Sequence, residues 1–231
     1  MRLTVEHVAR VFRQVPAEDI IPGPGMVKMT EEDYAAAIAR LLANGPQTED
    51  IWFFAYGSLI WKPACEFVEI RTGIVRGWHR AFCLGWNERF RGSPENPGLM
   101  LALDRGGACK GVLYRFPPNA IEANLKKLLE REMGWKPSPF PPRWVNVETE
   151  AGIIRALTFC IDRNSGRYVS GLSEPEIANV LARAVGSRGS MAEYLHSTVE
   201  HLERLGIHDA HLWRLQEMVA DRIDGLTAEP D

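Results

Sequence analysis

Apolar residues recur with two different periods along this chain, and the changes between them mark three regions. Over residues 1–49, the apolar positions of Val5–Arg13 and Tyr34–Leu42 recur at helical spacing, which predicts two helices. From Ile51 to Ile161 most apolar runs are short and turn-forming residues separate them, which is the pattern of strands. Residues 173–225 return to helical spacing. A block of strands between helical blocks predicts an α+β fold.

The strand region contains many short candidates with turns between them. A loop rich in turn formers covers residues 89–98, and the residues Asp104–Gly107 read as a further turn. Strands of this length and spacing predict an antiparallel sheet or a small barrel rather than a parallel α/β fold. The predicted strands are 51–54, 67–70, 73–75, 78–86, 99–103, 111–116, 143–149 and 153–161.

One helix interrupts the strands and carries a candidate catalytic acid. Its apolar residues Ile121, Leu125, Leu128 and Leu129 lie within roughly one quarter of the helix circumference, at about 100° per residue. Glu132 falls in the middle of that arc, so we expect its carboxylate to be desolvated and its pKa to be raised unless a cation or hydrogen-bond donors offset the burial. A carboxylate of this kind transfers protons near neutral pH. The alternative is that Glu132 lies past the last buried turn, or pairs with Arg143 or another basic residue.

The first strand of this region ends in a second candidate site. Ile51–Phe54 is an unbroken apolar run, and it leads through Ala55 and Tyr56 to Gly57 and Ser58, before Leu59 returns to apolar packing. Glycine has no Cβ, so the backbone can bend there or approach a ligand closely. Successive N–H groups at such a place can bind an anion such as a carboxylate. The alternative is an ordinary strand followed by a tight turn.

The C-terminal helices begin at recognisable caps. Ser173 with Glu176, and Ser190 with Glu193, have the spacing of capping boxes, so Glu193 is most simply a cap. Tyr194 reads as a half-buried residue with its hydroxyl near water, with a functional role as the alternative. A flexible turn is predicted at residues 186–189. Four histidines in this region lack a nearby acid or cysteine pattern, so we expect solvent-facing imidazoles rather than a metal site. They are His196, His201, His208 and His211.

Composition excludes several classes of protein. The 231 residues are 45% hydrophobic and 25% charged, as in soluble globular proteins. A net charge of −3 without a basic run argues against a nucleic-acid partner or an anionic membrane surface. No apolar segment approaches the roughly 20 residues that cross a bilayer. The N-terminal residues lack the pattern of a secretory signal, so the sequence predicts a cytoplasmic protein.

The four cysteines are scattered, and none forms a C-x-x-C pair. This spacing argues against a disulfide framework and against a zinc site. Cys83 and Cys160 lie in apolar runs, where reduced core thiols are expected. No cysteine has a local histidine or turn motif that would activate it as a nucleophile.

Four segments resemble the ChaC family of glutathione-specific γ-glutamylcyclotransferases. They are Phe54–Trp61, Arg91–Gly98, Arg131–Met133 and Gly186–Leu195, which includes Glu193–Leu195, in the order found in the family. The resemblance covers roughly residues 50–225. It implies the γ-glutamylcyclotransferase-like fold, a small mixed β-barrel with flanking helices. We therefore divide the chain into a helical N-terminal extension (1–49), a catalytic domain (50–225) and a C-terminal tail (226–231).

The resemblance also implies a reaction and the residues that perform it. Enzymes of this family are carbon–nitrogen lyases that cleave glutathione into 5-oxoproline and Cys-Gly, without a metal or another cofactor. The resemblance assigns the general acid/base role to Glu132 and the γ-glutamyl group to the loop formed by Phe54, Ala55, Tyr56, Gly57, Ser58 and Leu59. Tyr194 is a further candidate. Arg91 is the weakest: an exposed loop arginine is usually solvated, although it can also bind a substrate carboxylate.

Two alternatives remain open at the level of sequence. The first keeps the cyclisation but changes the substrate to another γ-glutamyl amine or γ-glutamyl amino acid. The second is a non-catalytic binding or regulatory protein on the same fold. Placing Glu132 outside any pocket would favour the second alternative.

Overall fold

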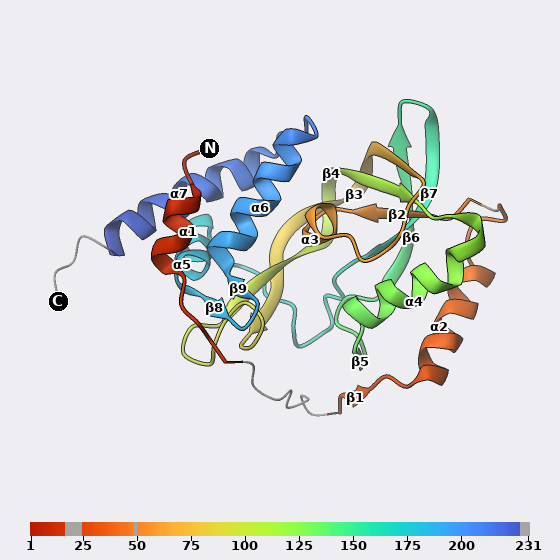
Figure 1. Cartoon of the computed structure of the whole chain (residues 1–231), viewed down its shortest axis with the longest axis horizontal. Coiled ribbons are helices and arrows are strands. Elements are labelled where there is room, and N and C mark those ends of the chain that lie inside the picture. The colour runs from red at the N-terminus through yellow and green to blue at the C-terminus, as the bar shows by residue number, and fades with distance from the viewer. Residues whose placement is uncertain (17–24, 49, 227–231) are drawn as a thin grey trace. The chain divides into compact units, whose positions relative to one another are not determined.

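The computed structural model describes residues 1–16, 25–48 and 50–226 (Figure 1). The predicted C-terminal tail lies outside these residues, apart from residue 226 at the end of the last helix. The elements in chain order are α1 (Val5–Val11), β1 (Val27–Lys28), α2 (Glu31–Ala43), β2 (Trp52–Ala55), α3 (Ser58–Trp61), β3 (Glu69–Asn87), β4 (Gly98–Arg115), a 3₁₀ turn (Pro118–Ala120), α4 (Ile121–Glu132), β5 (Trp135–Lys136), β6 (Pro142–Thr149), β7 (Gly152–Phe159), α5 (Glu174–Arg183), β8 (Val185–Gly186), β9 (Gly189–Ser190), α6 (Met191–Arg204) and α7 (Ala210–Leu226).

The chain divides into two compact units. One, here called the barrel unit, comprises Ile20–Arg80 and Leu103–Asp162. The other, the helical unit, comprises Met1–Asp19, Ala81–Ala102 and Arg163–Asp231. The predicted extension over residues 1–49 is thus shared, since α1 belongs to the helical unit and α2 to the barrel unit. The boundaries of a catalytic domain over 50–225 remain a prediction.

A closed barrel with the strand order β2-β4-β3-β6-β7 confirms the predicted small barrel. Strand β2 pairs antiparallel with β4, with Phe54 opposite Leu113, and parallel with β7, with Trp52 opposite Ala156. The predicted hairpin is also present, because β6 and β7 pair antiparallel. The parallel pairing of β2 with β7 makes the barrel mixed.

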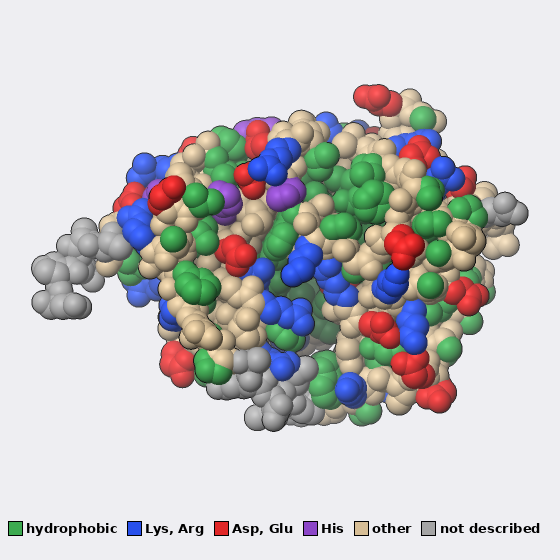
Figure 2. Space-filling view, in the orientation of Figure 1, with side chains coloured by type: hydrophobic (Ala, Val, Ile, Leu, Met, Phe, Trp, Pro, Cys, Tyr) green, Lys and Arg blue, Asp and Glu red, His purple; other side chains and the backbone are tan. Residues whose placement is uncertain are grey.

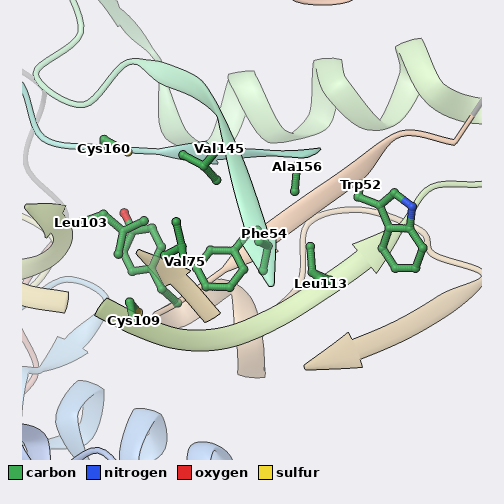
Figure 3. Packing of buried hydrophobic residues seen from close by; sticks show 11 residues of the cluster. Trp52, Phe54, Val75, Leu103, Cys109, Leu113, Val145, Ala156 and Cys160 are labelled. Carbon is green, nitrogen blue, oxygen red and sulfur yellow. The ribbon is translucent and has the colours of Figure 1, made fainter. Parts of the chain in front are cut away.

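All five barrel strands contribute to one buried apolar cluster (Figure 3). Phe54 and Leu113 are completely buried, and Val75 and Val145 come from neighbouring strands. An unbroken apolar sequence in β2 is therefore explained by burial on both faces, since Phe53 is also inaccessible and its ring lies 6.0 Å from that of Phe159. This packing fixes the end of β2, from which the candidate loop departs.

Between Ile51 and Ile161 the number of strands was predicted too high. The candidates 67–70, 73–75 and 78–86 form one strand, β3, and the candidates 99–103 and 111–116 form one strand, β4. The predicted turn at Asp104–Gly107 is wrong. Gly106 and Gly107 adopt φ angles of 104° and 64° inside β4, which bends the strand locally without reversing it.

The predicted helices are present. Thr30 caps α2 through a capping box with Asp33, and Ser173 forms a capping box with Glu176 at α5. In the helical unit, α1 packs against α6 and α7. The fully buried Gln216 accepts hydrogen bonds at Oε1 from the backbone N–H groups of Arg2 (2.9 Å) and Leu3 (2.7 Å). These bonds attach the start of the chain to α7.

The surface and the thiols agree with the composition. Figure 2 shows acidic and basic side chains interspersed over the face that it draws. Among the described helices, none combines the length and apolar composition that crossing a bilayer requires. The four cysteines, all among the described residues, are thiols outside any disulfide, and Cys83, Cys109 and Cys160 are buried. Burial raises the pKa of Cys160 to about 12, which keeps this thiol protonated and unreactive at neutral pH.

Candidate functional site

Side-chain hydrogen bonds to the backbone fix the end of β2 and the start of the loop that follows it. The carbonyl of Phe54 accepts from Thr158 Oγ1 (2.9 Å), and the carbonyl of Tyr56 accepts from Nε of the buried Arg80 (2.6 Å). Ala55 is also buried. These contacts leave little freedom to the backbone just before Gly57.

Ser58 begins a single helical turn, α3, which the sequence did not reveal. Gly57 precedes the turn, and its carbonyl accepts from Ile60 N (2.9 Å). The buried hydroxyl of Tyr114 donates to the Ile60 carbonyl (3.1 Å). Burial raises the pKa of Tyr114 to about 12, so this hydroxyl keeps its proton. Leu59 is buried, whereas Ser58 is only partly covered. The predicted tight turn is therefore a short helix that presents Ser58.

Glu132 lies at the last residue of α4. Leu125, Leu128 and Leu129 are completely buried, as their spacing predicts. The Glu132 side chain is 18% exposed and lies 3.1 Å from Nε of Arg131. Both interpretations offered for Glu132 therefore hold in part, because the carboxylate is mostly buried and also pairs with a basic residue, its neighbour rather than Arg143.

The Arg131 guanidinium connects Glu132 with the loop after β2. Its Nη2 donates to Ser58 Oγ (3.2 Å), and its Nη1 donates to the carbonyl of Lys62, which follows α3. Glu132 and Ser58 are thus brought together through one intervening side chain, in the barrel unit. Sequence reasoning treated Arg131 only as part of a motif, and its position in the last turn of α4 was the signal available.

Arg91 is not the solvated residue that an exposed loop position suggested. It is buried in the helical unit, and its Nη1 donates to Glu193 Oε2 (2.6 Å) and to the Ser190 carbonyl (3.0 Å). Its guanidinium carbon lies 5.6 Å from the centre of the Tyr194 ring. No hydrogen-bond partner is found among the described residues for Nε or Nη2, which leaves one edge of the guanidinium open.

The structure also corrects the interpretation of the two residues beside it. Tyr194 is 3% exposed and therefore buried rather than half-buried. Ser190 Oγ accepts from Glu193 N (3.0 Å), which confirms the predicted N-cap. The Glu193 carboxylate does not complete a capping box, because it pairs with Arg91 instead. Arg91 and Tyr194 are thus brought together, 103 positions apart in the chain.

The backbone that carries Arg91 is fixed by a residue that sequence reasoning missed. Asn87 Oδ1 accepts from the N–H groups of Arg89 (3.3 Å), Phe90 (2.8 Å) and Arg91 (2.9 Å). The predicted flexible turn at 186–189 is a hairpin of β8 and β9, and Ser187 N donates to the Arg89 carbonyl (2.8 Å). An asparagine before a loop is the only local signal for this role.

The histidines form no metal site in the part of the chain that the structure describes. His208 Nδ1 lies 2.7 Å from Glu203 Oε1, and His211 Nδ1 lies 2.9 Å from Glu174 Oε1. His196 is partly buried, which lowers its pKa. It is therefore not the solvent-facing imidazole that was expected.

Comparison with known proteins decides the family. A family model described as "ChaC-like protein" matches residues 51–222, about three quarters of the chain. The chain belongs to the ChaC-like family. Every candidate site residue lies inside the matched range, whereas α1 and α2 precede it.

Named relatives of this ChaC-like chain support the same conclusion. A relative from Escherichia coli, named "Glutathione-specific gamma-glutamylcyclotransferase", is 40% identical over 179 residues, which cover 77% of this chain and 76% of the relative. A mouse relative named "Glutathione-specific gamma-glutamylcyclotransferase 1" is 31% identical, covering 73% and 78%. A crystal structure of the yeast glutathione-specific enzyme superposes with a TM-score of 0.68 at 22% identity, covering 75% of this chain and 97% of that one. This last similarity confirms the predicted fold.

Proposed function

We propose that this protein is a glutathione-specific γ-glutamylcyclotransferase, which cleaves glutathione into 5-oxoproline and Cys-Gly. The observation that carries the proposal is the mostly buried Glu132 carboxylate, which Arg131 connects to Ser58 of the loop after β2. Relatives that bear this activity in their names share up to 40% of the matched sequence.

The reaction combines one intramolecular attack with the movement of two protons from the attacking nitrogen to the leaving nitrogen. The α-ammonium group of the γ-glutamyl residue loses a proton to Glu132, and the free amine attacks the γ-carbonyl carbon. A new C–N bond closes the five-membered ring, and the bond from that carbon to the cysteine nitrogen breaks. Glu132 gives its proton to the leaving nitrogen as that bond breaks, and the ring nitrogen gives up a second proton, which brings the amine of Cys-Gly to its ammonium form, so no net acid or base is consumed.

The remaining candidate residues hold the substrate. Because the attack is intramolecular, holding the γ-glutamyl group in a near-attack geometry supplies much of the acceleration. In the proposal, backbone N–H groups near Gly57 and Ser58 bind the α-carboxylate, and the residues Phe54–Leu59 shape this part of the site. Arg91 and Tyr194, in the helical unit, are proposed as a second substrate-binding group, since the open edge of the guanidinium suits a carboxylate.

The test measures 5-oxoproline release from glutathione and, in parallel, from γ-glutamyl-alanine. Wild type is compared with Glu132→Gln, which keeps the size of the side chain but cannot accept the proton. Glu130→Gln is the matched control, because Glu130 lies on the same helix with a 44% exposed side chain and lies 3.7 Å from Lys126. The proposal predicts release from glutathione by wild type and by the control, and loss of release in a folded Glu132→Gln variant.

Two outcomes would change the conclusion. Release from γ-glutamyl-alanine alone would keep the mechanism and replace the substrate. Release from neither compound would contradict the enzyme proposal and leave a binding or regulatory protein on this fold. We also propose a cytoplasmic location, which fractionation with an antibody to the protein would test.

A further inference from the structure

We propose that Arg131 is a positioning residue that holds the Glu132 carboxylate and the loop after β2 in one fixed arrangement. This inference rests on the proposed function, because it assigns Arg131 a role in the same reaction. The three guanidinium nitrogens have three different partners. Nε pairs with Glu132 Oε1 (3.1 Å), Nη2 donates to Ser58 Oγ (3.2 Å), and Nη1 donates to the Lys62 carbonyl.

The first reason for the inference is the shape of the guanidinium. Its donors lie in one plane at fixed angles, so partners bound at all three nitrogens are fixed in direction relative to one another. The partners belong to segments far apart in the sequence, the ends of α3 and the end of α4. A single side chain therefore sets where the proposed base lies relative to the proposed substrate loop.

The second reason is that α3 needs support from outside. It has only four residues, and an isolated helix of this length is unstable in water. No side chain caps its start. Arg131 contacts the hydroxyl of its first residue, Ser58, and the carbonyl of Lys62 just after its last residue. The guanidinium thus supports both ends of the turn that follows Gly57.

The third reason is that helix geometry alone does not produce the contact with Glu132. Neighbouring residues on a helix point about 100° apart, so their side chains do not ordinarily face each other. Here the Arg131 side chain, 24% exposed, reaches Glu132 at the point where α4 ends. Completely buried leucines at positions 125, 128 and 129 hold the axis of α4 in place. We infer that the arrangement selects one orientation of the carboxylate.

The experiment compares Arg131→Met, Arg131→Lys and Ser58→Ala in glutathione cleavage. Arg131→Met removes all three contacts, and we expect kcat/KM to fall about 100-fold, as for a misplacement of about 1 Å in a catalytic site. Arg131→Lys keeps the positive charge but lacks the planar set of donors, so we expect kcat/KM to lie between those of Arg131→Met and wild type. Ser58→Ala removes one contact and should have a smaller effect.

A matched control separates positioning from a general loss of charge on α4. Lys127→Met removes a cation one turn earlier, where Lys127 pairs with Glu66 (2.8 Å) and is 48% exposed. We expect this variant to keep kcat/KM within about threefold of wild type, because an exposed ion pair contributes little to stability.

Chemical rescue gives a readout that a purely structural role would not produce. Guanidinium ion added to Arg131→Ala at non-denaturing concentration should restore part of kcat, whereas it should not help Lys127→Met or Glu132→Gln. Loss of activity in Arg131→Ala without rescue, or an Arg131→Met variant as active as wild type, would overturn the inference. If Arg131→Met does not fold, kcat/KM of the Arg131→Lys and Ser58→Ala variants tests the inference instead. An inactive wild type would instead contradict the proposed function.

Discussion

Two arginine–glutamate pairs, one in each unit, differ in how deeply the two partners are buried: the partners are similarly buried in the barrel unit, whereas in the helical unit the arginine is buried and the acid exposed. In the barrel unit, Arg131 lies 3.1 Å from Glu132, and the acid is the more buried partner, with 18% of its side chain exposed against 24% for the arginine. In the helical unit, Arg91 lies 2.6 Å from Glu193. There the arginine is 11% exposed and the acid 43%.

This difference separates the chemistry that each pair can perform. A carboxylate can accept a proton and return it, which is what a general acid/base does when it reaches the substrate. A buried arginine cannot give up its proton, so its open donors are suited to holding an anion. Under the proposed function, the barrel pair supplies the general acid/base and the helical pair an anion-binding group, and the burial of each partner is the observed difference between the pairs.

The largest effect expected from this comparison is on the two acids. Glu132→Gln should lower kcat for glutathione by about 10²–10⁴-fold, the usual contribution of a general acid/base. Glu193→Gln should change kcat by no more than about threefold, because an exposed partner of an ion pair contributes little. Steady-state kinetics of both variants test the difference, and equal losses of kcat would remove the distinction between the pairs.

The next effect concerns the buried cation. Arg91→Ala should raise KM for glutathione by about 10–100-fold, because hydrogen bonds to charged groups contribute about 1.5–3 kcal/mol, and kcat should change less. Arg91→Lys should recover only part of the loss, since lysine lacks the planar fork. Glutathione ethyl ester lacks the charge of the glycine carboxylate, so comparing its KM with that of glutathione tests whether Arg91 binds this carboxylate. An unchanged KM in Arg91→Ala would exclude this residue from substrate binding.

A smaller effect is expected from the glycine that adjoins this pair. Gly189 has φ +105°, and a Cβ there would lie 2.0 Å from Glu193 Oε2 and 2.9 Å from Arg91 Nη1. Gly189→Ala should therefore displace the carboxylate and destabilise the protein by about 1–3 kcal/mol, as strained backbone positions do. Urea unfolding measures the loss.

Gly206→Ala is the control for this prediction, because Gly206 has φ +67° but nothing within 4 Å of its Cβ position. Both variants carry backbone strain, and only Gly189→Ala disturbs the ion pair. KM for glutathione should therefore rise in Gly189→Ala and stay unchanged in Gly206→Ala. A rise in both would show that strain alone accounts for the change.

The smallest effect comes from a third glutamate, which lies on the surface of the helical unit. Hydrogen bonds from Arg214 (2.8 Å) and His211 (2.9 Å) lower the pKa of Glu174 from its usual 4.5 to about 2. Because the folded-state pKa is lowered, this group stabilises the fold above pH 4.5, and its contribution is lost as the pH falls toward about 2.

The measurement is thermal unfolding of wild type and Glu174→Gln at pH 7 and pH 3. We expect the variant to be less stable at pH 7 by at most about 1 kcal/mol, since exposed pairs are screened by solvent. The difference should shrink at pH 3. A difference that stays constant between the two pH values would show that the carboxylate charge is not its source.

Local patterns predicted what depends on local structure. The spacing of Leu125, Leu128 and Leu129 was sufficient to place Glu132 toward the interior, and the local pattern at Ser190 was sufficient to predict the N-cap of α6. Two adjacent glycines, Gly106 and Gly107, are compatible both with a turn that reverses the chain and with a bend inside one strand. The sequence therefore predicted two strands where the structure has the single strand β4. Pairing with the neighbouring strands β2 and β3 decides between a turn and a bend, and the local sequence does not show this pairing.

The pairing of Arg91 with Glu193 could not be predicted for a related reason. The two residues lie 102 positions apart, and each has an adequate local explanation, a solvated loop arginine and a helix cap. Asn87 also has no local pattern that distinguishes three accepted hydrogen bonds from an ordinary turn. In contrast, Arg131 was adjacent to the predicted acid, and only its reach to Ser58 was missing.

The attachment of the chain start to α7 bears on how far the protein can be shortened. Residues 1–50 lie outside the family match, so the match alone gives no reason to keep them. A chain trimmed to residue 51 would lose the completely buried Leu3 side chain, at a cost of about 2–5 kcal/mol if the space stays empty. It would also leave the buried Gln216 acceptor without its two donors, at about 1–3 kcal/mol. The segment that matches the family model is therefore expected to be less stable alone than the full chain, because residues before it contribute to the packing of α7.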